Sequence, residues 1–400
     1  MGFSQEETHR YINYLIIAFA FAFPISKAAV NLLEFLIFLL WIYEGNWEYK
    51  RKLLFSSRFM LAFALFMIYI LVSVLWASDP LYWAAYVMKY HHYLLLPVIY
   101  TSLEKKYIRY LFYAFIASMF ISEILSYGIY FGLFTYGKAT PAFPTPFMHH
   151  ITYSVVLAFT STILLVNALS EKSLATKIFD TLFFMTVVTN LFLNGGRTGQ
   201  VIFIVLIFTV LLMYIKNRVK AIGIATLIVV MTFTLAYNFS NNFASRIHQF
   251  EKGISKMVYE NDFRDQGGMR AAMWIVGTDV FRDNFLVGTG IGNVMHDANH
   301  YVAMHHFKAR DMKIFADYHN VFINIAAQLG VIGLLLLLHI FYRIYKLEFK
   351  TREYAILNRT FLISFLLFSC THNTVHIMFP MVFFTLFSGT FSAISRIENS

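Results

Sequence analysis

An arginine lies between glycines at the point where two apolar runs meet, in 194-NGGRTGQ-200. The two glycines before Arg197 permit unusual backbone angles and close approach of other groups. The threonine and glycine after it open the next helix, whose free N–H groups favour an anion. The guanidinium itself is a planar, permanently charged fork that suits a phosphate. An arginine that only snorkels to a membrane interface is the simpler interpretation, but the flanking glycines and the helix start favour an anion site.

A second arginine begins an amphipathic segment, in 267-GGMRAAMWIVGTDVFRDNFLVGTGIGN-293. The expected packed side of the segment from Arg270 onward comprises Met273, Trp274, Val276, Val280 and Phe281. The G-T-G-I-G run that follows is a weak signal for a dinucleotide site, because neither a preceding strand nor a βαβ unit is present. Taken alone, Arg270 is better explained as a solvated residue at a helix start.

A histidine follows an aspartate at the start of a long apolar run, in 317-DYHNVFINIAAQLGVIGLLLLL-338. Helical spacing places His319 on the same face as Ile323 and Ala326, so its ring points along a packed helix. Histidine is the usual general base near neutral pH. A capping or interfacial histidine is an equally good interpretation of this residue alone. Asn320 directly follows it and is a candidate for substrate binding.

Other polar groups at the ends of apolar runs are weaker candidates. Lys89 in 88-MKYHHY-93 and the pair His149–His150 can contact substrate or only water. In 372-HNTVH-376 the two histidines are four apart, which is a zinc-binding spacing on a helix. The segment is typical of a short turn and has no evident third ligand, and the short outer loops hold no carboxylate pair. We therefore expect neither a metal nor a cofactor.

The elements that position these residues are expected to cross a membrane. The chain has 400 residues, of which 58% are hydrophobic and 14% charged, whereas about a quarter is charged in a typical soluble domain. A single cysteine excludes an internal disulfide and a CxxC metal site. The apolar residues fall into twelve segments: 11–26, 28–43, 59–76, 87–101, 108–134, 151–168, 178–194, 200–215, 221–238, 319–342, 356–371 and 376–394. The sequence thus predicts an all-α polytopic membrane protein with about 12 transmembrane helices.

The distribution of basic residues predicts the topology. If the N-terminus is cytoplasmic and the segments alternate, the short outer loops contain only Lys27, Lys89, Lys138 and Arg197 of the 32 lysines and arginines. Most of the others lie in inner loops, as the positive-inside rule requires. We expect a single membrane domain over 1–400, both termini in the cytoplasm, and one long periplasmic loop, 239–318, between spans 9 and 10. The net charge of +10 follows from topology, so a nucleic-acid partner is not expected.

The order of these motifs resembles the O-antigen ligase and polymerase family of bacterial envelope proteins. It comprises G-R-T-G in an outer loop, an arginine that opens an amphipathic segment of a long outer loop, G-x-G-x-G, and Y-H-N at the start of a span that continues through Q-L-G-V-I-G. The resemblance covers about 190–340, and the twelve-span layout extends it along the chain. The stretch 143-FPTPFMHHITYS-154 is similar to the ligase branch.

The resemblance implies an inverting glycosyltransferase of the C-type membrane fold (GT-C) in the bacterial inner membrane, active on the periplasmic side. The implied donor is a glycan on undecaprenyl pyrophosphate, and the implied acceptor of a ligase is the outer sugar of lipid A-core. By motif position, Arg197 and Arg270 hold the pyrophosphate and His319 takes the proton of the acceptor hydroxyl. Because pyrophosphate is already a good leaving group, two arginines can stabilise its charge without a metal.

Three other functions are compatible with the sequence. An O-antigen polymerase joins lipid-linked repeat units and needs two lipid-pyrophosphate sites, hence more outer cations than the short loops provide. A protein O-oligosaccharyltransferase usually has a further soluble region at its C-terminus. A lipid-linked sugar transporter places cations at the bilayer midplane, whereas Glu34 and Glu123 are the exceptional charges within the apolar segments here. The ligase is the preferred interpretation and the polymerase the main alternative.

Overall fold

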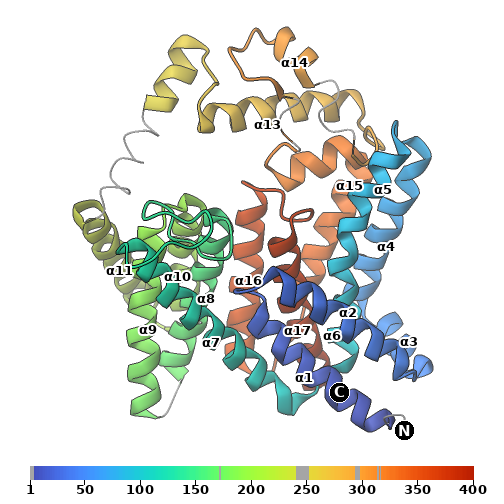
Figure 1. The fold of residues 1–400 in the computed structure, drawn as a ribbon, viewed down its shortest axis with the longest axis vertical. Helices are drawn as coiled ribbons and strands as arrows, with labels where there is room; N and C mark the ends of the chain where they lie inside the picture. Colours follow the sequence, from blue (N-terminus) through green and yellow to red (C-terminus); the bar gives the residue numbers. More distant parts are fainter. Residues whose placement is uncertain (1–3, 171–172, 240–251, 293–297, 313–314, 316) are drawn as a thin grey trace.

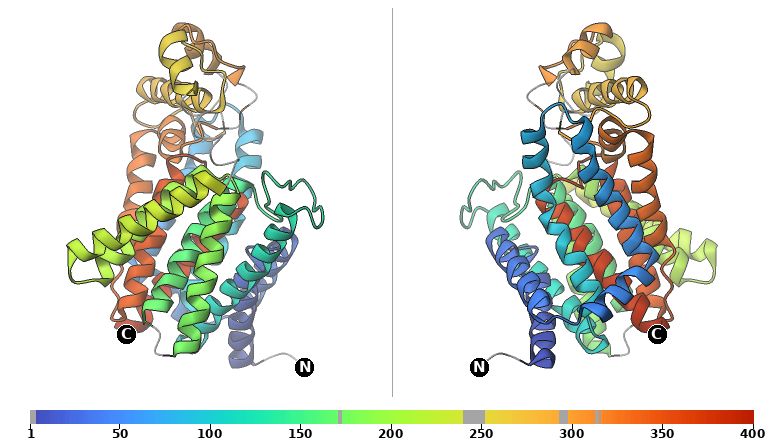
Figure 2. Two further views of the ribbon diagram at one scale, coloured as in Figure 1. Left: turned by 90° about the vertical axis from the view of Figure 1, so that its left-hand side faces the viewer. Right: turned by 90° about the vertical axis from the view of Figure 1, so that its right-hand side faces the viewer.

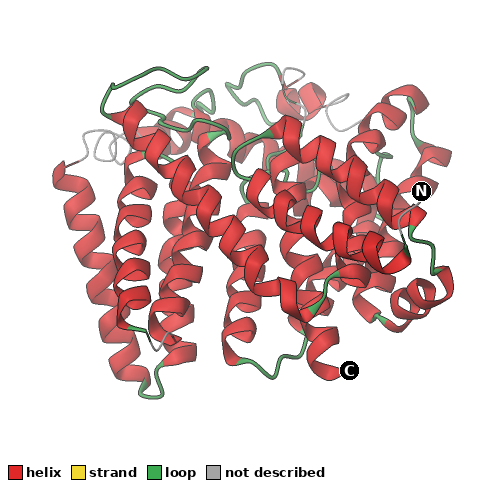
Figure 3. Cartoon of the chain, turned by 60° about the horizontal axis from the view of Figure 1, so that its bottom comes forward, coloured by secondary structure: helices red, strands yellow, loops and turns green. Residues whose placement is uncertain are grey.

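The computed structural model describes residues 4–170, 173–239, 252–292, 298–312, 315 and 317–400. This part of the chain is helical, and Figure 3 shows helices joined by short loops. The elements are α1 (Gln5–Ala22), α2 (Lys27–Tyr43), α3 (Trp47–Ser56), α4 (Arg58–Val72), η1 (Ser73–Trp76), α5 (Pro80–Met88), η2 (Lys89–Leu94), α6 (Leu95–Ser102), α7 (Lys105–Tyr130), α8 (His150–Ser170), α9 (Leu174–Leu193), α10 (Arg197–Tyr214), α11 (Arg218–Phe239), α13 (Gln266–Asp283), α14 (Ala298–Met304), α15 (Val321–Tyr345), α16 (Arg352–Ser369) and α17 (Met378–Asn399).

Eleven of the twelve predicted apolar segments coincide largely with one helix each, whereas 87–101 is divided among the end of α5, η2 and α6. Fewer than twelve helices meet the length and composition of a membrane span. Among the described residues, eight helices are long and apolar enough to cross a bilayer. The number becomes nine if α2 and α3, which are bent by 113° at a short break, form one broken span. The helical membrane architecture is therefore as predicted, whereas the number of twelve spans and the GT-C assignment stay predictions.

The chain ends and the long loop lie at opposite ends of the molecule. In Figure 1 the N- and C-termini are at the bottom and α13 and α14 are at the top, and the side views of Figure 2 agree. α8 and α17 form the centre of the molecule, since most of the apolar stretch of each helix is buried within the protein. The bounds of the long loop, 239–318, and the membrane side of the termini stay predictions.

Two glycines of the 194-NGGRTGQ-200 motif let α10 pack closely on α8. A Cβ at Gly196 would lie 2.4 Å from the Ser154 side chain, and one at Gly199 would lie 2.3 Å from the Ser154 backbone. The Ser154 hydroxyl accepts the Gly199 N–H at 3.2 Å. Close helix approach through small residues is a common packing mode in membranes. It fixes the start of α10, and with it Arg197, beside the start of α8.

The loop after α13 is hydrogen-bonded to a kink in α15. Gly330 has φ +64° and ψ −167° and interrupts the helix. The Thr289 and Gly290 N–H groups donate to the Ala327 and Gln328 carbonyls at 2.9 Å, and the Val331 N–H donates to the Phe285 carbonyl at 2.8 Å. The first two bonds use carbonyl groups, and the third uses an N–H group, that the kink leaves without helical partners. The long loop is thereby held against the membrane helices at a defined position.

α13 lies over the beginning of α15. Its buried face includes Met273, Val276 and Val280, as the amphipathic pattern predicted. Gly277 faces Tyr318 and Ile323, since a Cβ there would lie 2.4 Å from the Ile323 side chain. Arg270 is seven residues before Gly277, which is two helical turns, and therefore lies on the same face of α13. α13 therefore positions Arg270 on the side that faces the beginning of α15.

Candidate functional site

His319 is held by the carboxylate of Asp317. The Asp317 Oδ1 atom lies 2.7 Å from the His319 Nδ1 atom and also accepts the His319 backbone N–H at 2.7 Å. Asp317 is buried, with 6% of its surface exposed. A carboxylate beside Nδ1 fixes the tautomer in which Nδ1 carries the proton and Nε2 carries the lone pair. The arrangement is that of an oriented general base.

The backbone of His319 is in an unusual conformation. Its φ is +51°, in the left-handed region that side chains other than glycine adopt infrequently. Such residues cluster at functional sites, where surrounding contacts stabilise them. Here the Asp317 carboxylate provides one such contact, and Asn320 caps α15 directly afterwards by accepting the Phe322 and Ile323 N–H groups at 2.9 and 3.2 Å.

The charge balance of this dyad favours an ionised Asp317. Burial alone would raise the pKa of the carboxyl group, but hydrogen bonds and charge from His319, with a further contribution from Asn373, hold the pKa below its usual range. The aspartate is therefore negative at neutral pH. It can stabilise an imidazolium when Nε2 accepts a proton.

The two arginines predicted from separate motifs are near enough for the charge of one to act on the other. Burial, and then the charge of Arg197, lowers the pKa of Arg270. An arginine side chain stays charged at physiological pH. The two guanidinium groups therefore repel each other in a partly buried place. A doubly charged anion between them would relieve it. The sequence alone could not bring these residues together.

Two further histidines, His149 and His372, lie near His319 and Arg270. Partial burial, followed by the charges of Arg270 and His319, lowers the pKa of His149. His372 lies with its ring centroid 6.1 Å from that of His319. Burial is the main cause that lowers the pKa of His372 to about 4, and His319, His149 and Arg270 contribute. Both histidines are therefore neutral at pH 7, when they can donate or accept a hydrogen bond.

A second group of polar residues, Tyr86, His376 and Lys89, adjoins Asp317 from the side of α5. The Tyr86 ring stacks on His376 with centroids 3.3 Å apart, and the Tyr86 carbonyl accepts a hydrogen bond from His376 Nε2 at 3.3 Å. Burial raises the pKa of Tyr86 to about 12, and Asn373 and Asp317 are among its neighbours. Lys89 is exposed on η2, and its charge acts on His376. Lys89 thus borders this second group.

Two predicted residues make structural contacts. Besides capping α15, Asn320 donates to the Cys370 carbonyl at 3.0 Å and so ties α15 to the end of α16. His150 packs against Phe143, with ring centroids 4.6 Å apart, in the loop that precedes α8. Pro144, Pro146 and Met148 of this loop are buried, as expected for a loop that dips into the protein. These contacts position the neighbouring His149 at the start of α8.

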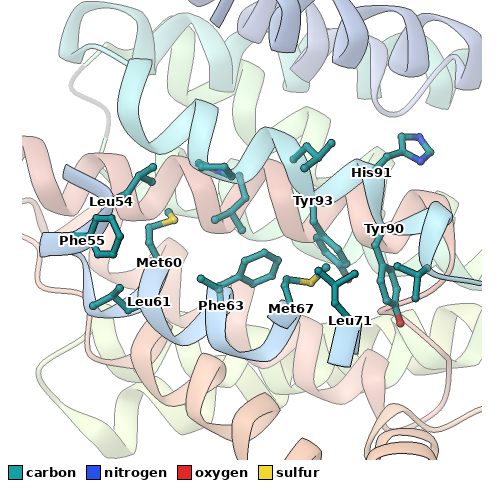
Figure 4. Close-up of a pocket in the computed structure, with 15 residues that line it drawn as sticks. Leu54, Phe55, Met60, Leu61, Phe63, Met67, Leu71, Tyr90, His91 and Tyr93 are labelled. Carbon is teal, nitrogen blue, oxygen red and sulfur yellow. The ribbon is translucent and has the colours of Figure 1, made fainter. Parts of the chain in front are cut away.

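An apolar groove of about 540 Å³ begins near the second group. Figure 4 shows it between α4 and the η2–α6 segment, with Phe63, Met67 and Leu71 on one wall and Tyr90 and Tyr93 on the other. The Tyr90 ring lies 5.9 Å from the His376 ring. The groove therefore leads from the second group along apolar side chains, and its volume lies in the usual range of ligand sites.

Sequence reasoning assigned no role to several residues of the site. Asp317 was noted only as a neighbour of His319, although a carboxylate two residues before a candidate base is a usable signal. Tyr86 and Asn373 carry no such signal, because their position beside Asp317 depends on contacts between distant helices. His372 and His376 were considered only as a metal pair; in the structure their rings face different partners, Phe368 and Tyr86 respectively.

The described fold and site define a helical membrane protein with a partly buried Asp–His pair and two arginines whose charges act on each other. Residues 182–338 match the family model described as O-Antigen ligase (Wzy_C). This stretch runs from α9 to α15 and includes Arg197, Arg270 and His319, so the match confirms the resemblance to this family that the motifs indicated. The family implies a glycosyltransferase-like enzyme that uses lipid-linked glycans. No curated protein matches the chain.

Proposed function

We propose that this protein is an inverting, metal-independent glycosyltransferase that transfers O-antigen polysaccharide from undecaprenyl pyrophosphate to a sugar hydroxyl of lipid A-core. His319 is the general base, and Arg197 and Arg270 bind the pyrophosphate. The observation that carries the proposal is that the charges of Arg197 and Arg270, about 70 positions apart in the sequence, act on each other, and that Arg270 and His319 both act on His149 and His372. The His319 Nδ1 atom is in turn bound by Asp317.

The reaction follows from this geometry in one displacement. The acceptor hydroxyl oxygen attacks the anomeric carbon of the donor while its proton passes to Nε2 of His319. The bond between that carbon and the pyrophosphate oxygen breaks, and undecaprenyl pyrophosphate leaves with the electron pair. Asp317 stabilises the imidazolium, and the two arginines stabilise the negative charge on the leaving group. A positioned base contributes about 10²–10⁴-fold to such a step.

The apolar groove supports a polyprenyl-linked donor. Its end at Tyr90 adjoins His376 and Lys89, so a chain in the groove would place its pyrophosphate near the polar cluster. Its lining between Phe63 and Leu71 offers apolar contact to isoprenoid units. The opposite positions of the termini and α13 support a site on the periplasmic side of the inner membrane with both termini cytoplasmic.

The lipopolysaccharide of a strain that lacks the gene tests the proposal. The strain is complemented with wild type or His319→Ala at equal protein level. We expect wild type to restore the long-chain ladder, and the variant to leave bare core while lipid-linked polymer accumulates. A single repeat unit on the core in the strain lacking the gene would identify a polymerase instead. A full ladder with His319→Ala would refute the role of His319.

A further inference from the structure

A second cluster of histidines lies apart from the Asp317–His319 pair. Glu34 of α2 and His91 and His92 of η2 place one carboxylate oxygen and two imidazole nitrogens within 4.8 Å of one another. Glu34 and His92 are buried, with 5% and 4% of their surfaces exposed, whereas half of the His91 side chain is exposed. The cluster joins two elements that are distant in sequence.

Hydrogen bonding defines which nitrogen of His91 faces the carboxylate. The Nδ1 atom lies 3.0 Å from the Met88 carbonyl oxygen. A carbonyl oxygen can only accept, so Nδ1 carries a proton and, in the neutral ring, Nε2 carries the lone pair. That lone pair faces Oε2 of Glu34 at 3.7 Å. Two acceptors directed at each other are unfavourable unless a cation lies between them.

His92 brings a second imidazole nitrogen to the Glu34 carboxylate. Its Nδ1 atom lies 2.7 and 3.0 Å from the two carboxylate oxygens of Glu34, and its ring centroid is 3.9 Å from that of His91. The two imidazoles and the carboxylate therefore meet at one point, where a divalent cation satisfies all three groups with one charge centre.

We propose that Glu34, His91 and His92 form a Zn²⁺ site that joins α2 to η2. Two imidazoles and one carboxylate, without a thiolate, are a common zinc ligand set. Bonds of about 2.0–2.2 Å at tetrahedral angles separate the ligand atoms by about 3.3–3.5 Å. The 3.7 Å separation between His91 Nε2 and Glu34 Oε2 is already close to this value, whereas the 2.7 Å separation between His92 Nδ1 and Glu34 Oε2 must widen by about 0.6–0.8 Å. A rotation of the Glu34 carboxylate can provide this change, and water can occupy the fourth position.

The metal would hold the segment that borders the groove. η2 carries Lys89 and Tyr90, and Figure 4 shows the His91 ring turned away from the apolar side chains Met67 and Leu71. The Zn²⁺ ion would therefore act on the stability of the α2–η2 junction and would not touch the transferred sugar. The inference stands independently of the glycosyltransferase reaction.

Metal binding by the full-length protein in phospholipid nanodiscs tests the proposal. Protein stripped with a chelator is titrated with Co²⁺, whose visible absorption reports imidazole ligation, and Zn²⁺ is then added as competitor. We expect one site per chain in wild type and at least about tenfold weaker binding in His91→Ala and Glu34→Gln. His300→Ala, which removes an exposed histidine of α14, should bind as wild type does. Zn²⁺ should also raise the thermal midpoint of wild type and His300→Ala only.

The proposal is wrong if wild type binds Zn²⁺ no more tightly than His91→Ala, because the cluster is then an ion pair with a protonated His91. Equal weakening in His300→Ala would also overturn it, since binding would then belong to surface histidines in general. If Glu34→Gln does not fold, His91→Ala decides the question, because this half-exposed side chain can be removed without opening the core.

Discussion

Replacement of Asp317 by asparagine tests the link between the dyad and the chemistry. The amide has nearly the same shape, but it carries no charge and can present N–H to His319 Nδ1, which favours the tautomer with the proton on Nε2. The base then has no lone pair directed toward the acceptor hydroxyl. A hydrogen bond to a charged group contributes about 1.5–3 kcal/mol, and each 1.36 kcal/mol is a factor of ten in rate. We therefore expect kcat to fall by about 10- to 150-fold.

The assay follows transfer of glycan from undecaprenyl pyrophosphate to lipid A-core by purified protein. The KM for the donor should change by less than about threefold, because Asp317 acts through His319 and not on the pyrophosphate. The double variant Asp317→Asn/His319→Ala should be no slower than His319→Ala alone, since the two residues act as a unit. A loss that appears in the donor KM with kcat unchanged, or fully additive losses, would refute the reasoning.

Four further outcomes follow. Arg270→Gln should lower kcat/KM for the donor at least about tenfold, through loss of charge-assisted bonds, in the same transfer assay. Ala64→Trp should fill the groove and raise the donor KM, whereas Ala117→Trp on the exposed face of α7 should not. Gly330→Ala should lower the thermal midpoint by several degrees, because φ is +64° and the added Cβ would lie 2.2 Å from the Leu286 carbonyl oxygen. The pKa of His372 is about 4 in the folded protein and about 6.5 in the unfolded chain. The unfolded chain therefore binds more protons between these two pH values. Lowering the pH from 7 to 5 should reduce the free energy of unfolding by about 2 kcal/mol through this residue. His372→Phe should therefore lose less thermal stability between pH 7 and pH 5 than wild type; an equal loss would contradict the assignment.

Most of the helical framework was predictable because apolar runs long enough for a membrane leave little choice of structure. Eleven of the twelve predicted segments coincide largely with one helix each, and their errors occur mainly at ends such as that of α16 at Ser369. The segment 87–101 is instead divided among the end of α5, η2 and α6. Length and composition alone support eight or nine spans. The short α6 and the charged ends of α1 and α16 explain the difference from twelve.

The site was predictable only where a residue contrasts with its local sequence. Arg197 and His319 stand out because each lies at the end of an apolar run. The closeness of Arg270 to Arg197 depends on hydrogen bonds between the loop after α13 and the kink at Gly330, and no periodicity indicates such a contact. Tyr86 is equally invisible, because its position beside Asp317 depends on how α5 packs against distant helices.

Reconstitution of the purified protein in liposomes tests the central claim most directly. Wild type and His319→Ala are given undecaprenyl-pyrophosphate-linked glycan and lipid A-core, and both the glycosylated lipid and the released undecaprenyl pyrophosphate are measured. The proposed mechanism predicts equal amounts of the two products with wild type and at least a hundredfold slower formation of both with His319→Ala. Absence of transfer by wild type, or transfer by His319→Ala at the wild-type rate, would contradict it.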